Sequence, residues 1–174
     1  HRAPRVGQHI DQVVIALHFG VGHAAGEDHL VGDAEPLRLL LLIPYAWLYE
    51  HARVLELDAG SPWVWLGGFV AVDLCFYWAH RSLHRYNLLW GAHQSHHSSE
   101  DFNLSTALRK GAFQTAFDWP FYLPLALLGL PLPLFLLLLG IQLAYQFWIH
   151  TQHIERMGWL EKIIITPSHH RVHH

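Results

Sequence analysis

The residues with the clearest chemical potential in this sequence are closely spaced histidines. Histidine accounts for 17 of the 174 residues, and imidazole is the commonest protein ligand for transition metals. Three groups stand out by spacing: His80-Arg-Ser-Leu-His84, His93-Gln-Ser-His96-His97 and His169-His170-Arg-Val-His173-His174. Side chains three or four residues apart share one face of a helix. Each group is therefore predicted to present two or three imidazoles to a single point, as a metal-binding box.

The number of histidines favours more than one metal ion. His150 follows the longest apolar stretch and adds a further candidate ligand to the three boxes. A catalytic zinc takes about three protein ligands and a water, so eight or more imidazoles indicate two ions. Imidazole suits iron, zinc, copper and nickel, and the ligand type alone does not identify the metal. The single cysteine, Cys75, excludes a cysteine-built site and an intrachain disulfide.

The composition points to a membrane. Charged residues make up 14% of the chain and apolar residues 52%, whereas soluble globular chains carry about 25% charged residues. The net charge of −3 is small, which argues against nucleic acid as a partner.

Three apolar stretches must position the boxes. Residues 37–49 are short of the ~20 needed to cross a bilayer as a helix, while residues 62–79 are close to that length and carry one charge, Asp73. Residues 119–149 carry no charge and are interrupted by Gly-Leu-Pro-Leu-Pro at 129–133, which predicts a hairpin of two helices. The expected fold is an all-α, integral-membrane bundle with about three to four membrane-embedded helices.

Loop charge predicts an orientation for this bundle. Residues 50–61 hold one arginine against three acidic residues, whereas residues 80–118 and 150–174 hold seven basic residues between them. Positive loops tend to stay in the cytoplasm, and the two basic segments also carry the boxes. We therefore expect a histidine-rich cap on the cytoplasmic side of a bacterial inner membrane or the endoplasmic reticulum.

The N-terminal part has a different character. Residues 1–36 are mixed in composition and show no pattern of a signal peptide. The sequence lacks a starting methionine and stops inside a histidine box. We accordingly expect a truncated N-terminal segment, 1–36, followed by one domain, 37–174, that is truncated at its C-terminus.

Several polar residues near the boxes are candidates to hold the ligands in place. A ligating imidazole commonly donates its other N–H to a carboxylate or a carbonyl. Asp73 lies seven residues, or two helical turns, before His80 and could reach a box histidine or an arginine. The full set of candidate partners is Asp73, Glu100, Asn103 and Asp118.

These motifs, in this order, resemble the fatty acid hydroxylase superfamily, also called the sterol desaturase family. The resemblance covers roughly residues 60–174. It rests on segments 73–84, 89–109, 145–151 and 166–174. The stretches HHSSEDFNLSTALR and FWIHT look closest to the alkylglycerol monooxygenase branch of the family.

The resemblance implies a membrane enzyme with a cytoplasmic di-iron centre that uses O2 to oxidise an unactivated C–H bond of a lipid. No catalytic residue beyond the metal ligands is implied. It implies an electron-donor protein or small reductant as well, which in the alkylglycerol branch is a reduced pterin. The positions that match family ligands are His80, His84, His93, His96, His97, His150, His170, His173 and His174, and His169 matches a family position too.

Other functions remain open at this level. Within the family, the reaction could be desaturation, and the substrate could be an ether lipid, a sterol, a carotenoid or a fatty acyl chain. A metal transporter would place its site near the bilayer midplane, whereas these boxes lie outside the apolar runs. A dinuclear zinc hydrolase would require a carboxylate base, and no HExxH motif is present. A structural metal without catalysis is the remaining alternative.

Overall fold

The computed structural model describes residues 28–111 and 113–174, and all regular elements among them are helices. The all-α class is therefore confirmed for the described part. Most of the predicted N-terminal segment, 1–36, lies outside the described residues. The elements are α2 (Asp28–Ala52), α3 (Pro62–Arg85), α4 (Asn87–His97), η1 (Thr106–Leu108), α5 (Gln114–Asp118), η2 (Trp119–Tyr122), α6 (Leu123–Leu127), α7 (Leu132–Trp148), η3 (Gly158–Lys162) and α8 (Pro167–His173).

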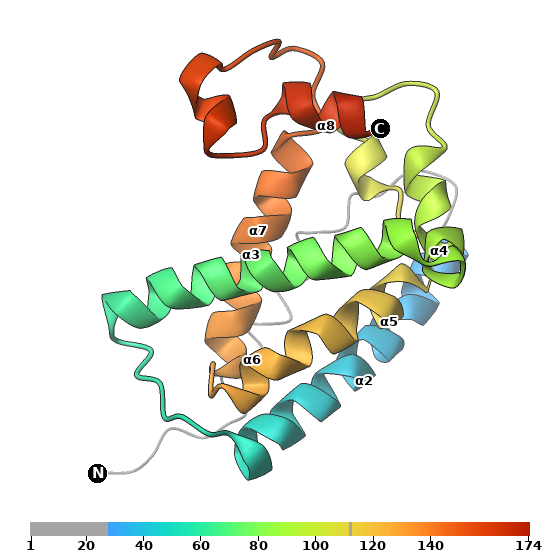
Figure 1. Ribbon diagram of the computed structural model, residues 1–174. Helices are drawn as coiled ribbons and strands as arrows, with labels where there is room; N and C mark the ends of the chain where they lie inside the picture. Colours follow the sequence, from blue (N-terminus) through green and yellow to red (C-terminus); the bar gives the residue numbers. More distant parts are fainter. Residues whose placement is uncertain (1–27, 112) are drawn as a thin grey trace.

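The uncharged stretch forms the predicted hairpin. Its first arm consists of η2 and α6, which continue from α5, and its second arm is α7 (Figure 1). The first arm ends in a Schellman motif: the N–H of Leu130 donates to the carbonyl of Leu125 at 2.9 Å, and Gly129 donates to Ala126 at 3.0 Å. Gly129 adopts φ 89°, which only glycine adopts without strain.

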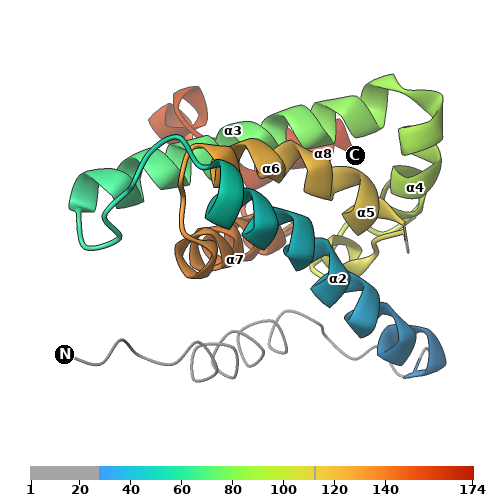
Figure 2. The same ribbon diagram turned by 90° about the horizontal axis from the view of Figure 1, so that it is seen from below.

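An aromatic core holds the hairpin against α2. Tyr45 of α2 stacks on Phe135 of α7, with ring centroids 4.7 Å apart, and its hydroxyl donates to the carbonyl of Leu130 at 2.9 Å. Trp119 and Tyr122 from η2 pack against the same Phe135 ring. Helix α2 runs alongside α6, and α3 crosses α7 (Figures 1 and 2). This packing fixes where α3 and α7 end, and both ends carry histidines.

Among the described helices, α3 alone is long and apolar enough to cross a membrane. Only 17% of its most apolar 18-residue window is buried, whereas the apolar core helix of a soluble fold is mostly buried. Trp63 and Val70 are 79% and 58% exposed. With 17 residues, α7 spans about 26 Å, short of the ~30 Å hydrocarbon core. The described helices thus include one of membrane-spanning length and apolarity, and the expected three to four embedded helices stay a prediction.

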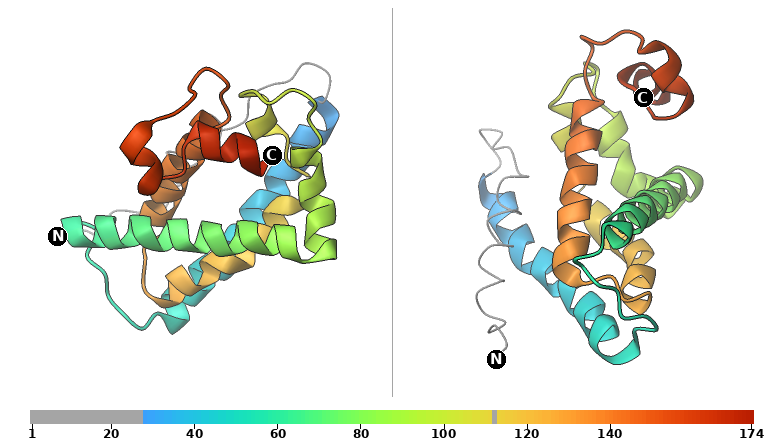
Figure 3. Two further views of the ribbon diagram at one scale, coloured as in Figure 1. Left: turned by 45° about the horizontal axis from the view of Figure 1, so that its top comes forward. Right: turned by 90° about the vertical axis from the view of Figure 1, so that its left-hand side faces the viewer.

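The histidine-bearing elements meet at one end of the molecule. Helix α8 lies over the C-terminal end of α7 and beside α4, although these segments are far apart in sequence (Figure 3). The end of α3 leads directly into α4 at the same place (Figure 1). The cap expected from sequence is thus an assembly of helix ends.

Candidate metal centre

Nine of the ten predicted histidines converge in two groups, each with ligand atoms within 4.8 Å of one another. We call them the five-histidine cluster and the four-histidine cluster. The five-histidine cluster consists of His80, His84, His93, His97 and His173. The four-histidine cluster consists of His96, His150, His170 and His174.

The Nε2 atoms approach one another as ligands of a common ion would. Nε2 of His80 lies 2.9 Å from Nε2 of His173, and Nε2 of His150 lies 2.9 Å from that of His170 and 3.2 Å from that of His96. Neighbouring nitrogens bound at ~2.1 Å to one ion lie roughly 3.0 to 3.4 Å apart. Nε2 of His174 is buried without a hydrogen-bond partner. The donor set therefore fits two metal ions.

The two clusters adjoin each other. The His97 and His174 rings stack with centroids 4.3 Å apart, and the His93 and His96 rings stack at 5.0 Å. Each pair takes one ring from each cluster. The arrangement therefore suits a dinuclear centre better than two separate sites.

The second and third boxes are each divided between the clusters, which corrects the expectation that a box faces one point. His93 and His97 enter the five-histidine cluster, while His96 enters the four-histidine cluster. At 100° per residue, His96 and His97 point about 100° apart on a helix, with His93 between them and nearer to His97. The HxxHH pattern is thus wide enough to serve two ions from one helix.

The third box repeats this division in the reverse sense. His170 and His174 enter the four-histidine cluster, and His173 enters the five-histidine cluster. His169 belongs to neither cluster and is exposed. Its side chain points about 100° away from that of His170, so the geometry does not support the prediction of His169 as a ligand.

Backbone carbonyls hold several imidazoles in a defined tautomer. Nδ1 of His96 lies 3.1 Å from the carbonyl oxygen of Thr106, and Nδ1 of His150 lies 2.6 Å from that of Gln146. Since a carbonyl only accepts, Nδ1 must carry the proton, which leaves the Nε2 lone pair free for a metal. The sequence does not reveal these partners, because any residue supplies a carbonyl.

A buried amide serves His93 in the same way. Nδ1 of His93 lies 3.3 Å from Oε1 of Gln114, and Nε2 of Gln114 donates to Oδ2 of Asp118 at 3.4 Å. Asp118 was predicted to contact a ligand histidine. In the structure it contacts Gln114, and Gln114 in turn contacts His93. Sequence reasoning missed Gln114, since a lone glutamine at a helix start carries no spacing signal.

The other predicted polar partners have different neighbours. Asp73 accepts a hydrogen bond at 2.8 Å from Gln142 of α7 rather than from a box histidine or an arginine. Asn103 accepts from the backbone and hydroxyl of Ser105, and so shapes the loop that brings the Thr106 carbonyl to His96. Glu100 is exposed to solvent. Of these three, only Asn103 contributes to the clusters, and it does so indirectly.

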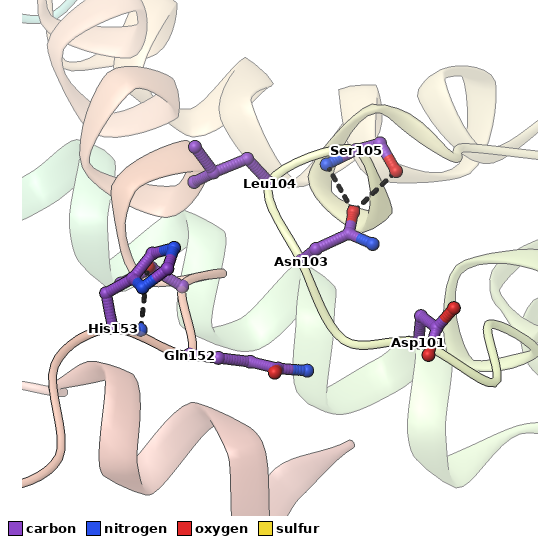
Figure 4. Close-up of a pocket in the computed structure, with 7 residues that line it drawn as sticks. Asp101, Asn103, Leu104, Ser105, Gln152 and His153 are labelled. Carbon is purple, nitrogen blue, oxygen red and sulfur yellow. Dashed lines mark hydrogen bonds between the residues drawn. The ribbon is translucent and has the colours of Figure 1, made fainter.

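A cavity of about 410 Å³ lies between the loop 101–105 and residues 151–153. Figure 4 shows Asn103 bonded to Ser105 on one side and His153 on the other. His153 lies in this cavity and outside both clusters. Its backbone N–H donates to Oγ1 of Thr151 at 3.2 Å.

Helix α8 is fixed by two charged side chains. Arg171 donates to the carbonyls of Thr151 and Ile154 at 2.9 and 2.8 Å. Glu161 accepts from the hydroxyls of Ser168 and Thr166 at 2.5 and 3.3 Å. These contacts tie α8 to the chain that leaves α7, so that His150 and the third box come together.

Burial keeps the imidazoles neutral, as metal binding requires. Burial, with the nearby His84 and His173, lowers the pKa of His93 to about 4, although its bond to Gln114 opposes the shift. Burial and the neighbouring histidines lower the pKa of His174 to about 4 as well. Desolvation penalises the charged form, and at neutral pH both rings are free to bind a metal.

Comparison with known proteins identifies the family. The family model described as "Fatty acid hydroxylase" matches residues 65–174, which include all ten predicted histidines. The chain belongs to the fatty acid hydroxylase family. This agrees with the resemblance found in the sequence, and members of the family are lipid-oxidising, membrane-associated enzymes.

The chain has similar relatives in this family from animals and from bacteria. Human alkylglycerol monooxygenase is 49% identical over 79% of the chain and 31% of its own length. Alkylglycerol monooxygenase of Caenorhabditis elegans is 38% identical over 79% of the chain and 27% of its own length. An ornithine lipid hydroxylase of Rhizobium tropici is 34% identical over 62% of the chain and 33% of its own length. The chain thus spans about a third of these proteins, and no solved structure matches it.

Proposed function

We propose that this chain forms the metal-binding part of a membrane-bound di-iron monooxygenase that uses O2 to hydroxylate an unactivated C–H bond of a lipid. The observation that carries the proposal is the pair of adjoining clusters with five and four imidazoles. A transporter needs to release its ion, whereas nine clustered imidazoles, three of them held in a fixed tautomer, suit a resident cofactor. A zinc hydrolase would leave a carboxylate base among the ligands, and both clusters consist of histidine alone.

The residues of the chain have distinct roles in this proposal. The nine clustered histidines would hold two irons, which supply the redox chemistry that no side chain provides. Gln114 and the carbonyls of Thr106 and Gln146 orient three of the ligands. Phe102 covers one side of the four-histidine cluster, with its ring 5.5 Å from His150 and 5.1 Å from His174.

An ether lipid is the substrate that the relatives favour. The most similar relatives reported above are named alkylglycerol monooxygenases, and the bacterial relative is named an ornithine lipid hydroxylase. Both names describe oxygen insertion into a lipid. We therefore favour hydroxylation over desaturation. We also propose an electron donor, either a partner protein or a small reductant such as a reduced pterin.

The membrane arrangement is part of the proposal. Helix α3 would cross the bilayer with His80 and His84 at one end of the span. The segments 80–118 and 150–174, which carry the clusters and most of the basic residues, would face the cytoplasm.

The first experiment is Mössbauer spectroscopy and metal analysis of the protein purified from membranes after growth on iron-57. We expect about two irons per chain and a reduced spectrum that changes when O2 is admitted. The variant His173→Ala should lose iron, whereas His169→Ala, on the same helix, should retain it. Stoichiometric zinc from iron-replete cells, or equal iron loss in both variants, would refute the proposed centre.

A further inference from the structure

A second hollow opens directly onto the five-histidine cluster. It has a volume of about 380 Å³ and is lined by Tyr77, His80, Arg81, His84, Ile165 and His173. Three of these six residues belong to the cluster. A cavity of this size is within the range of small-molecule sites, and a molecule bound here would lie against the candidate metal ligands.

The hollow continues an exposed apolar line on α3. Val70, Leu74 and Tyr77 are 58%, 55% and 48% exposed. They follow one another at intervals of four and three residues and therefore share a face of the helix, which Arg81 extends by a further turn. Because α3 is the membrane-length helix, this face offers an alkyl chain a path from the bilayer to the hollow.

Arg81 is the permanently charged residue of the lining. Its guanidinium donates to the hydroxyl of Tyr77 at 3.0 Å and lies 5.9 Å and 6.0 Å from the Tyr77 and Trp78 ring centres. The ion pairs within the described residues join Arg53 to Glu50 and Glu56 and do not involve Arg81. Most of its N–H donors therefore have no carboxylate to bind, although a guanidinium binds anions through two parallel hydrogen bonds.

We propose that this hollow is the lipid-binding site and that Arg81, held by Tyr77, binds a phosphate in the head group of a single-chain lipid. The alkyl chain lies along Val70 and Leu74, and the head group lies beside the five-histidine cluster. This inference rests on the proposed function, and it adds the class of substrate: a lipid with one alkyl chain and an anionic phosphate head.

The test is equilibrium binding of radiolabelled monododecyl phosphate to the iron-loaded protein in neutral maltoside micelles. Arg81→Gln should weaken binding at least tenfold, and Tyr77→Phe should weaken it less. Arg85→Gln is the matched control, since Arg85 lies one turn further along α3 and outside the lining; it should change the Kd less than twofold. Dodecanol, which lacks the phosphate, should bind all variants equally.

Three results would overturn the inference. Equal weakening by Arg81→Gln and Arg85→Gln would indicate a general effect of surface charge. An equal loss of dodecanol binding would indicate damaged packing. Inorganic phosphate binding as tightly as dodecyl phosphate would indicate a site for free anions.

Metal analysis of the same samples separates this inference from the proposed function. Arg81-dependent binding by a protein that holds zinc would refute the oxygenase and leave the lipid site in place. Arg81-independent binding by a protein with about two O2-reactive irons would refute only the lipid site.

Discussion

At the scale of single residues, the clusters depend on partners that contact the far side of each imidazole. The Nδ1 atoms of His93, His96 and His150 each face an oxygen of a side chain or the backbone. These bonds fix the ring orientation and leave Nε2 for the metal. Gln114 is the one partner among these that mutation can remove without changing the backbone.

Replacing Gln114 with leucine should weaken metal binding in the five-histidine cluster by about tenfold, since loss of such a partner typically costs 10- to 100-fold. Gln114 is 5% exposed, and leucine fills a similar volume. The measurement is iron retained against increasing chelator. Gln152→Leu, at an exposed glutamine, is the control, and equal retention by the two variants would mean that Gln114 does not support the site.

The protein should retain its metal at a lower pH than a site built from exposed histidines would. Burial and neighbouring histidines lower the pKa of His93 and His174 to about 4 from the ordinary 6.5. Protons then compete with the metal only at lower pH. We expect iron release with a midpoint below about pH 5, measured by dialysis over a pH series. Release centred near the ordinary histidine pKa would show that the rings are not desolvated.

The same shifts predict the pH dependence of the metal-free fold. Because the pKa of His93 and His174 is lower in the folded state, the unfolded chain takes up protons first as the pH falls below 6.5. The free energy of unfolding should therefore decrease from about pH 6.5 towards about pH 4. Thermal unfolding of the metal-free protein at the two ends of this range would measure it.

At the scale of elements, the HxxHH box and the hairpin turn decide the geometry. In α4, the histidine side chains point in directions that span about 100° around the helix axis, so that one helix supplies ligands to both clusters. At the end of α6, Gly129 turns the chain with a positive φ, and a Cβ built there would lie 2.0 Å from the carbonyl oxygen of Leu55. The turn sets the start of α7, and hence the position of His150 at its far end.

Gly129→Ala should destabilise the protein by about 1 to 3 kcal/mol, because the left-handed φ strains an alanine and the Cβ meets the Leu55 backbone. Gly140→Ala is the matched control within α7, where a Cβ meets nothing within 4 Å. This change should stabilise the helix by roughly 0.5 to 1 kcal/mol. Thermal unfolding in detergent would compare the two, and a lower midpoint for Gly140→Ala than for Gly129→Ala would contradict the account.

At the scale of the whole molecule, the sequence predicted which regions meet, but not how they divide the metal sites. Histidines beside the ends of apolar stretches must lie near one another if the hairpin returns to its starting side, and they do. His96 and His173 each join a different cluster from the other clustered histidines of their own box. Which cluster each joins depends on how α3, α4 and α8 cross. No local spacing encodes that crossing.

Apolar composition alone does not distinguish helices that face lipid from those that pack inside the protein, and α3 is the one described helix with the length and apolarity of a span. In the first arm of the hairpin, the apolar residues Leu125 and Ala126 are 3% and 0% exposed, inside the core that includes Tyr45. Apolar residues that pack on the protein and those that face lipid look alike in sequence. The exposed side chains of α3 show the difference only once the fold is known.

The topology makes a last prediction about the two ends of α3. If α3 spans the bilayer, a cysteine at Ala59 should lie on the opposite side from cysteines at Glu100 and Arg156, all three of which are exposed. Single cysteines in a Cys75→Ala background can be labelled with an impermeant maleimide on intact bacterial cells. We expect labelling at position 59 in intact cells, and at positions 100 and 156 only after the membrane is opened. Labelling of all three cysteines in intact cells would place the clusters outside the cytoplasm. If instead all three cysteines were protected from the maleimide in intact cells, α3 would lie on the membrane without crossing it.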